Sequence, residues 1–236
     1  MTYYPVFIVL ILAVLNWIAT DKNWKTLGYV TKPGTMLAML WWMWQSVGLG
    51  GSVLWFTIGL IFCLAGDIFL MLPRDMFIFA LLAFLVGHIF YILGLNNTPP
   101  FINLRGILFA LILRNVLMIS TIVILGIYIV WLYPKLARGL SAKGKSKLRI
   151  PVLIYSLVIS LMVYSAVLTW LRVGWSAAAA LSVSLGAVLF YVSDSILAWD
   201  RFVNSIAQGR TMSIVSYHLG QIGIIFGAML YVVLNR

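Results

Sequence analysis

The chain has 236 residues, of which 64% are hydrophobic and 9% are charged, and its mean hydropathy is +1.08. A water-soluble domain of this length cannot bury so much apolar surface, so the composition excludes a soluble protein and indicates one that resides in a lipid bilayer. The net charge of +11 comes from sixteen Lys and Arg against five acidic residues. These basic residues lie in loops between apolar runs, which is typical of membrane orientation and not of nucleic-acid binding.

Eight apolar runs follow one another along the chain. Each is long enough to cross about 30 Å of hydrocarbon as a helix that rises about 1.5 Å per residue. Backbone groups in lipid need partners within their own segment, and no alternating barrel pattern occurs, so every run is predicted to be helical. The fold class is therefore an all-α membrane protein, a single transmembrane domain over residues 1–236 built as a bundle of about eight helices. The runs cover residues 3–20, 33–49, 52–72, 76–95, 107–133, 150–171, 174–198 and 211–234.

The boundaries of three runs depend on proline and arginine. Pro33 and Pro151 are predicted to open the second and sixth runs, because the missing N–H of proline costs nothing in the first helical turn. Arg114 lies in the first half of the fifth run and Arg105 lies just before it. Residues 101–114 are therefore an alternative interfacial segment, which would leave the span itself at 115–133.

The two halves of the chain resemble each other faintly. A basic residue and a proline open the second and sixth runs, an acid lies near the end of the third and seventh, and a histidine lies in the fourth and eighth. An even number of spans in each half would make this a parallel internal repeat of four plus four helices. The residues concerned are Lys32-Pro33 and Arg149 with Pro151, then Asp67 and Asp194, then His88 and His218.

The distribution of basic residues predicts the orientation. The loops after the first, third, fifth and seventh runs share one side and hold twelve of the sixteen, so this side is expected to be cytoplasmic and both termini to lie outside, in the inner membrane if the source is bacterial. The twelve are Lys22, Lys25, Lys32, Arg74, Lys135, Arg138, Lys143, Lys145, Lys147, Arg149, Arg201 and Arg210, and the opposite side holds Arg105, Arg172 and Arg236.

Two acids, Asp67 and Asp194, stand inside apolar runs near their predicted cytoplasmic ends. A charged residue in hydrocarbon costs ~2.5–3.5 kcal/mol on insertion scales, so an acid kept there usually has a function. Because both are expected at the same depth, they are predicted to form one catalytic pair. Asp75 and Asp200 lie at loop edges and are expected to be solvated.

Other polar residues converge on the same half of the membrane. Tyr217 and Gln221 are four residues apart, and His88 and Tyr91 are three apart, so each pair shares a helix face. Interhelical hydrogen bonds that hold the bundle together are the alternative explanation for these side chains. Lys32 and Tyr155 are expected at the same level, one at the start of the second run and one a turn into the sixth.

Two carboxylates in a dry site support general acid–base chemistry, in which one protonates a substrate and the other stabilises the resulting cation or orients a water. The sequence shows no metal-ligand spacing, nucleophile elbow, phosphate-binding loop or dinucleotide fingerprint, so neither a metal nor a cofactor is expected. The lone Cys63 cannot form an internal disulfide.

Six short motifs, spread over nearly the whole chain, resemble those of the YhhN-like family of integral membrane lysoplasmalogenases and occur in the family's order. They are Lys32-Pro33, GDIFLML (66–72), FLVGHIFY (84–91), PVLIY (151–155), GAVLFYVSDSILA (186–198) and YHLGQ (217–221).

The resemblance implies hydrolysis of the vinyl ether of a lysoplasmalogen to a fatty aldehyde and glycerophosphoethanolamine or glycerophosphocholine. It implies Asp67 and Asp194 as catalytic residues and a lysophospholipid as partner. Substrate-binding roles fall on Lys32, His88, Tyr91, Tyr155, Ser193, Tyr217 and Gln221, with the head group near Lys32.

A proton-coupled transporter of lipids or small molecules, with the two acids as proton carriers, is the alternative function. Such a carrier is expected to have helices broken by Gly or Pro near its acids. No break of this kind is seen beside Asp67 or Asp194, which favours the hydrolase.

Overall fold

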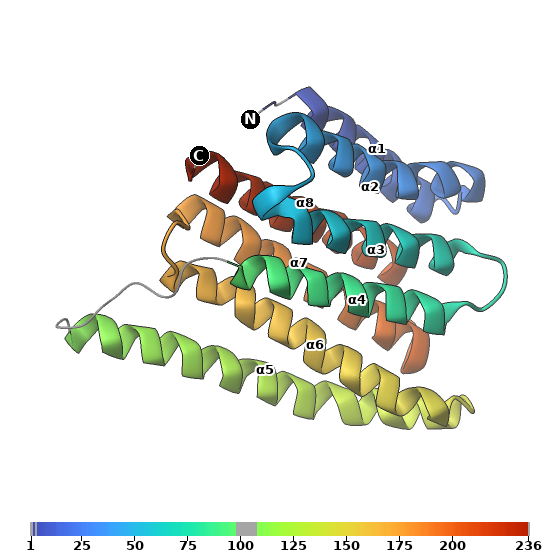
Figure 1. Cartoon of the computed structure of the whole chain (residues 1–236). Helices are drawn as coiled ribbons and strands as arrows, with labels where there is room; N and C mark the ends of the chain where they lie inside the picture. The colour runs from blue at the N-terminus through green and yellow to red at the C-terminus, as the bar shows by residue number, and fades with distance from the viewer. Residues whose placement is uncertain (1, 3, 98–107, 236) are drawn as a thin grey trace.

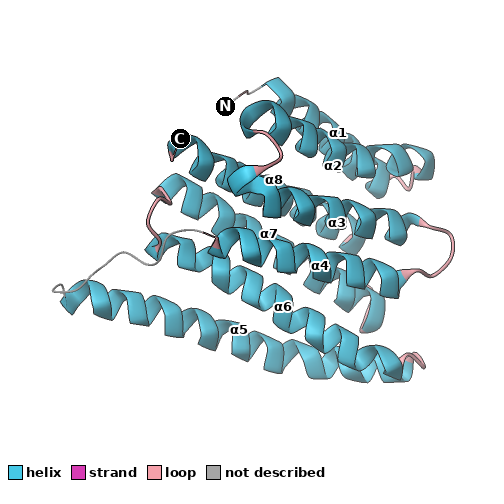
Figure 2. Ribbon diagram, in the orientation of Figure 1, coloured by secondary structure: helices cyan, strands magenta, loops and turns pink. Residues whose placement is uncertain are grey.

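The computed structural model describes residues 2, 4–97 and 108–235, and within these residues it is all-helical and contains no strand (Figures 1 and 2). The prediction of an all-α bundle is thus confirmed. The helices are α1 (Tyr4–Asp21), α2 (Lys25–Val47), α3 (Leu54–Met71), α4 (Phe77–Asn96), α5 (Leu108–Ala142), α6 (Arg149–Val167), α7 (Ala177–Phe202) and α8 (Gly209–Leu234), with short 3₁₀ turns at Gly51–Val53, Ser146–Leu148 and Leu168–Leu171.

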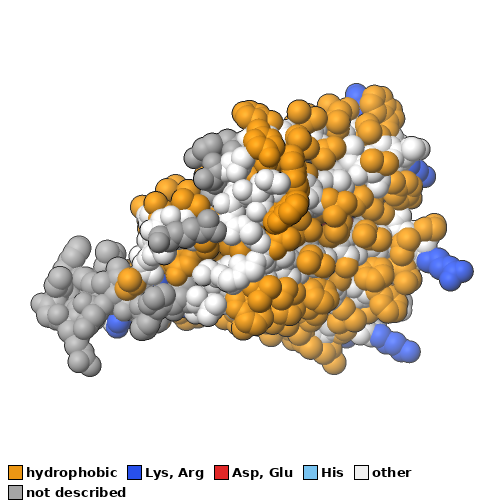
Figure 3. Space-filling model, turned by 45° about the horizontal axis from the view of Figure 1, so that its top comes forward, with side chains coloured by type: hydrophobic (Ala, Val, Ile, Leu, Met, Phe, Trp, Pro, Cys, Tyr) orange, Lys and Arg blue, Asp and Glu red, His pale blue; other side chains and the backbone are white. Residues whose placement is uncertain are grey.

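Seven of these helices, all except α2, are long and apolar enough to cross a membrane. α2 is less apolar because it carries Lys25 and Lys32. The surface of the bundle agrees with a lipid environment, since hydrophobic side chains cover most of the face seen in Figure 3. Many of these exposed side chains are Ile, Leu and Val, as expected where the solvent is hydrocarbon. The chain is an integral membrane protein.

Two helices extend through a proline, and one of these prolines, Pro33, was predicted to mark a boundary. α2 begins at Lys25, two turns before Pro33, so the prediction that Pro33 opens the helix was wrong. α5 runs through Pro134 to Ala142, well past its predicted end at residue 133. A proline inside a helix removes one backbone hydrogen bond, and packing of the flanking turns offsets this loss. The alternative interfacial segment at 101–114 lies partly outside the described residues, and the remainder belongs to α5.

Glycines bring two pairs of helices into backbone contact. In the α7–α8 pair, a Cβ on Gly186 would lie 2.6 Å from the backbone nitrogen of Ile224 and 2.7 Å from the carbonyl oxygen of Gly220. In the α3–α4 pair, a Cβ on Gly87 would lie 3.1 Å from the carbonyl oxygen of Gly59. Small residues of this kind allow close approach in membranes, where no hydrophobic effect drives helices together. These contacts fix the α3–α4 and α7–α8 pairs, which carry Asp67 and Asp194.

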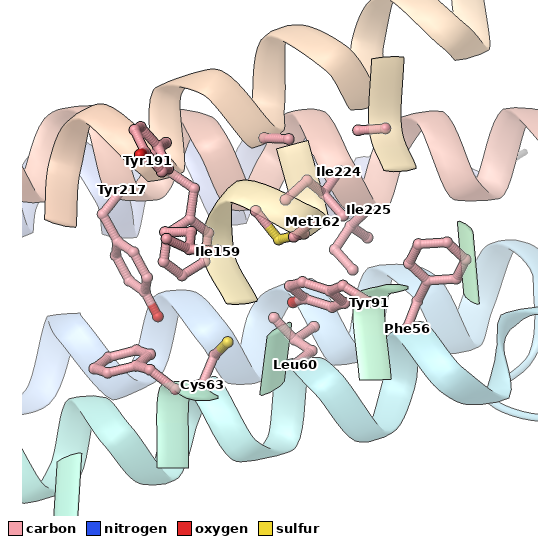
Figure 4. Close-up of a cluster of buried hydrophobic side chains, with 14 of the residues drawn as sticks. Phe56, Leu60, Cys63, Tyr91, Ile159, Met162, Tyr191, Tyr217, Ile224 and Ile225 are labelled. Carbon is pink, nitrogen blue, oxygen red and sulfur yellow. The ribbon is translucent and has the colours of Figure 1, made fainter. Parts of the chain in front are cut away.

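The interior between the helices is filled by large side chains. Figure 4 shows Leu60 of α3 and Tyr91 of α4 directed toward Ile225 of α8. The ring of Trp42 on α2 stacks on Phe226 with centroids 6.0 Å apart. These contacts tie α2 and α8 to the centre of the bundle, although α2 is the least apolar helix.

One end of the bundle is held by an ionic cluster. The loops α1–α2, α3–α4 and α5–α6 lie at this end, opposite the N- and C-termini (Figure 1). Asp75 pairs with Lys145 at 2.7 Å and with Arg201 at 2.6 Å, which joins the α3–α4 loop to the α5–α6 loop and to α7. Hydrogen bonding to Lys145, with the nearby Arg201 charge, holds the pKa of Asp75 below its usual range. Asp75 is exposed, as expected for a solvated acid, and it also joins the elements at this end.

Asp200 differs from the expectation of a solvated acid. It is half-buried in the last turns of α7, and its Oδ1 accepts the backbone N–H of Ile206 at 2.8 Å. This hydrogen bond fixes the turn that leads into α8.

We expect Gly186→Ala to destabilise the bundle, because the added methyl would overlap the α8 backbone, and backbone cannot be repacked as a side chain can. Overpacking of this kind costs about 1–3 kcal/mol. Gly126→Ala on α5 is the matched control, since nothing lies within 4 Å of a Cβ there. Thermal unfolding in detergent should show a lower Tm for the first variant alone, and equal Tm values would contradict the close packing of α7 on α8.

Candidate active site

Asp67 on α3 is buried, with 1% of its side chain exposed, and both of its carboxylate oxygens have partners. The Lys32 ammonium lies 2.9 Å from Oδ1, and the Tyr217 hydroxyl donates to Oδ2 at 2.8 Å. α2, α3 and α8 therefore meet at this one carboxylate. Charge-assisted hydrogen bonds on both oxygens hold the group in a single orientation.

The hydrogen bonds continue from Tyr217 into the bundle. Gln221, one turn further along α8, places Nε2 3.4 Å from the Tyr217 oxygen, and its Oε1 accepts the hydroxyl of Tyr91 at 2.6 Å. Tyr91 on α4 is fully buried. The polar chain thus begins at Asp67 and ends inside the core.

Asp194 on α7 has a different set of partners. The Tyr155 hydroxyl of α6 donates to its Oδ2, and His88 Nε2 of α4 lies 2.9 Å from the same hydroxyl and 3.7 Å from Oδ2. The Tyr155 hydroxyl has one proton, which it donates to Asp194. In the hydrogen bond between His88 and Tyr155, His88 Nε2 is therefore the donor and the Tyr155 oxygen is the acceptor. Oδ1 of Asp194 accepts no hydrogen bond from any described residue and is free to meet a substrate.

The two acids line one cavity of about 420 Å³, as the prediction of a pair requires. Lys32, Ser193 and Tyr217 line it as well, and so do four further polar residues that the sequence did not single out as site residues, Thr20, Arg201, Arg210 and Ser213. The complete lining is Thr20, Lys32, Asp67, Leu70, Phe84, Ser193, Asp194, Leu197, Arg201, Arg210, Ser213, Ile214 and Tyr217.

A second, smaller pocket of about 60 Å³ adjoins this cavity and is mostly apolar. Asp194, Leu70, Phe84 and Leu197 belong to both linings, whereas Asp67 belongs to the cavity alone. Asp194 therefore stands where a polar space meets an apolar one. The other residues that line the apolar pocket are Phe77, Ala80, Leu81, Leu132, Leu136, Val152, Tyr155, Ser156, Ile159, Tyr191, Ser195, Ala198 and Phe202.

The remaining predicted residues lie behind the acids. His88 touches Asp194 through Tyr155, and Gln221 and Tyr91 are one and two hydrogen bonds beyond Tyr217. None of these three lines the cavity. Their hydrogen bonds run instead to the tyrosines that contact the two acids.

The position of Lys32 differs from the one expected. It was predicted at the membrane–water edge, free to bind a head group, but the extra turns of α2 place it inside the bundle with 15% of its side chain exposed. Arg201 and Arg210 were counted only as loop charges. The signal that was missed is that residues at or near the end of a helix can also line a cavity located at that end.

His218 is buried and lies beside the site without lining it. Its Nδ1 accepts the indole N–H of Trp17 at 3.1 Å, so the imidazole proton of the neutral ring is on Nε2. Among the described residues, no group of three or more His, Cys or Asp side chains is placed to hold a metal ion.

The fold and the cavity define a class: a helical membrane protein with two acids from distant helices in one space inside the bundle. Residues 27–228 match the model of the YhhN family, and the chain belongs to this family. No solved structure matches it.

Curated relatives agree with this assignment. The chain is 29% identical over 227 residues to "Lysoplasmalogenase TMEM86B" of Mus musculus, covering 95% of this chain and 85% of the mouse protein. It is 30% identical over 162 residues to "Lysoplasmalogenase" of Mycobacterium tuberculosis, covering 66% of this chain and 52% of the mycobacterial protein. The pig TMEM86B lysoplasmalogenase is 26% identical over 220 residues, which are 92% of this chain and 82% of the pig protein.

Lys32→Met should destabilise the protein, because it leaves the Asp67 carboxylate buried without its cation. Removing one partner of a buried ion pair costs about 3–5 kcal/mol, and the partial exposure of Lys32 places the expected loss at the lower end. Adding Asp67→Asn should restore much of the Tm, since the uncompensated charge is then gone. Thermal unfolding of both single variants and the double variant tests this, and strictly additive losses would show that the pair is not coupled.

Proposed function

We propose that this protein hydrolyses the vinyl ether bond of lysoplasmalogens, giving a fatty aldehyde and a glycerophospho head group. The observation that carries the proposal is the place of Asp194, which lines both the polar cavity and the apolar pocket. A lysoplasmalogen has the same division, an apolar chain on one side of its vinyl ether and a polar head on the other. The names of the mouse and mycobacterial relatives support this substrate class.

In the proposed binding mode, the alkenyl chain occupies the apolar pocket and the glycerol lies in the cavity. The carbon that must be protonated is on the chain side of the ether oxygen. Asp194 is the acid on that side, with Oδ1 unoccupied. Asp67 faces the glycerol side, where its carboxylate is fixed by Lys32 and Tyr217.

The reaction then proceeds in three steps. Asp194, in its protonated form, gives its proton to the β-carbon of the vinyl ether, and the double-bond electrons form the new C–H bond, which leaves an oxocarbenium ion. Water adds to the cationic carbon and returns one proton to a carboxylate. The resulting hemiacetal breaks its C–O bond to release the aldehyde and the glycerol alcohol.

The carboxylate of Asp67 stabilises the cation in this sequence, as paired acids do at the oxocarbenium-like states of glycoside hydrolysis. The free Oδ1 of Asp194 and the occupied oxygens of Asp67 give the two acids different roles in the proposed reaction. Tyr155 and His88 act as positioning residues for the acid. Overall, one water is consumed, no electrons are transferred, and neither a metal nor a cofactor takes part.

The transporter is the weaker candidate. α3 and α7 are continuous through Asp67 and Asp194, and the hydrogen-bond chain from Asp67 stops at the fully buried Tyr91. A proton path to the opposite side would need a continuation that the described residues do not supply.

We also propose that the end of the bundle held by Asp75 is cytoplasmic and that both termini face away from the cytoplasm. The reason is that most of the Lys and Arg residues in the loops lie at this end. A reporter that is active only in the cytoplasm should be silent when fused after Arg236 and active when inserted in the α5–α6 loop at Gly144. The reverse pattern would invert the orientation.

Asp194→Asn and Asp67→Asn should each lower kcat by ~10²–10⁴, the usual scale for a positioned acid or base, because asparagine keeps the shape but removes the proton and the charge. The double variant should lose little more than the worse single variant, since groups that act as a unit are not additive. The measurement is aldehyde release from lysoplasmalogen by folded, monodisperse protein.

The matched control for this experiment is Asp21→Asn, because Asp21 is exposed at the end of α1 and pairs only loosely with Lys22 at 3.7 Å. It should keep wild-type turnover. Near wild-type turnover in either of the two site variants would remove that acid from the mechanism.

A further inference from the structure

Three cationic side chains line the cavity that holds the two acids, and two of them already have an anion. Lys32 pairs with Asp67 at 2.9 Å, and Arg201 pairs with Asp75 at 2.6 Å. Arg210, in the first turn of α8, makes no hydrogen bond or ion pair with any described residue, and its side chain is exposed. The lining therefore contains one guanidinium whose charge nothing in the described chain balances.

Arg210 also stands where two hollows meet. Another open hollow, of about 290 Å³, is lined by residues of α1, α2 and α3 and by Arg210 of α8, and it shares Thr20, Lys32, Leu70 and Arg210 with the acid-lined cavity. A ligand that enters the cavity from the basic end of the bundle passes this guanidinium before it reaches the acids.

The register of α7 against α8 gives the depth of Arg210 relative to Asp194. Ser193 Oγ donates to the carbonyl oxygen of Ser213 at 2.8 Å, and Ser213 Oγ donates to that of Ser193 at 3.1 Å, so these two residues lie at one level. Arg210 precedes Ser213 by three residues, which is about 4.5 Å along a helix. Asp194 lies one residue, about 1.5 Å, closer to the basic end than Ser193, so the Arg210 Cα is about 3 Å, roughly half a turn, closer to that end than Asp194, and its side chain extends further.

The backbone from which Arg210 projects is fixed. Asp200 Oδ1 accepts the N–H of Ile206 at 2.8 Å, and the N–H of Gly209 donates to the Ile206 carbonyl oxygen at 2.9 Å. The α7–α8 turn thus holds the start of α8 in one position relative to α7.

We infer that Arg210 binds the phosphate of the substrate's head group, and this inference rests on the proposed function. Six bonds separate the cationic carbon of the vinyl ether from the phosphorus, a span of about 7 Å when extended. That span agrees with about half a helical turn plus most of an arginine side chain. A guanidinium binds two phosphate oxygens at once, so it orients the head group as well as attracting it.

In this binding mode the head group contacts Arg210 and not Lys32, near which it was expected from the sequence. The Lys32 ammonium is engaged by the Asp67 carboxylate, whereas Arg210 pairs with no anion among the residues that the structure describes. Arg210 is thus a specificity-determining residue that distinguishes phosphate-bearing alkenyl lipids from alkenylglycerols that lack phosphate.

The test compares two substrates, an alkenyl-glycerophosphoethanolamine and the matching alkenylglycerol without phosphate. Arg210→Gln should lower kcat/KM for the phosphate-bearing substrate relative to the alkenylglycerol by about 10–100-fold. The loss should come mainly from a higher KM for the phosphate-bearing substrate, because hydrogen bonds to charged groups contribute about 1.5–3 kcal/mol. Arg138→Gln, at the same end of the bundle on α5 but outside both hollows, should leave the ratio unchanged. An equal loss for both substrates, or an unchanged ratio, would overturn the inference.

A binding measurement separates this inference from the proposed reaction. Glycerophosphoethanolamine should raise the Tm of the wild-type protein and of Arg138→Gln, but not that of Arg210→Gln. Equal stabilisation of Arg210→Gln would overturn the inference even if turnover is seen. Stabilisation that depends on Arg210, in a protein that releases no aldehyde, would reject the proposed function and keep the phosphate site.

Inorganic phosphate at the same concentration identifies the source of the ligand. A smaller shift than glycerophosphoethanolamine produces would support a head-group site. An equal, Arg210-dependent shift would support a site for phosphate from either source.

Discussion

The ion pair between Lys32 and Asp67 is the interaction on which the arrangement of the site depends. A carboxylate in the middle of an apolar bundle is tolerated only when a cation and hydrogen-bond donors surround it. Meeting that requirement brings α2 to α3 and turns Tyr217 of α8 toward them. It also explains how the least apolar helix keeps its place in the bundle, since α2 carries the cation that Asp67 needs.

The two acids are alike in sequence context but different in their surroundings. Asp67 has donors on both oxygens, whereas Asp194 has one oxygen engaged by Tyr155 and one that faces the cavity. Paired acids in enzymes divide their roles through such differences in environment. The asymmetry comes from neighbours on other helices, because the acids themselves occupy similar places near the ends of α3 and α7.

Much of this arrangement can be predicted from hydropathy and motif spacing. The number of helices, their order and the convergence of Asp67 and Asp194 all follow from where apolar runs begin and end. Pro33 was misread because a proline usually marks a helix start, and packing around α2 outweighed that preference. The pairing of Tyr155 with Asp194 and the place of Arg210 in the cavity lining could not be predicted, because a run uniform in hydropathy does not determine how its helix is rotated about its axis.

The position of α5 has a consequence for how this enzyme's kinetics should be described. Leu132 and Leu136 line the apolar pocket, while the neighbouring Val130 and Trp131 are 75% and 52% exposed on the outer side of the same helix. A single helix thus separates the pocket from the surrounding lipid (Figure 1). A lipid that reaches the pocket past α5 never leaves the bilayer. Its effective concentration is then its mole fraction among the membrane lipids, and diluting it with inert lipid at constant bulk amount would slow the reaction.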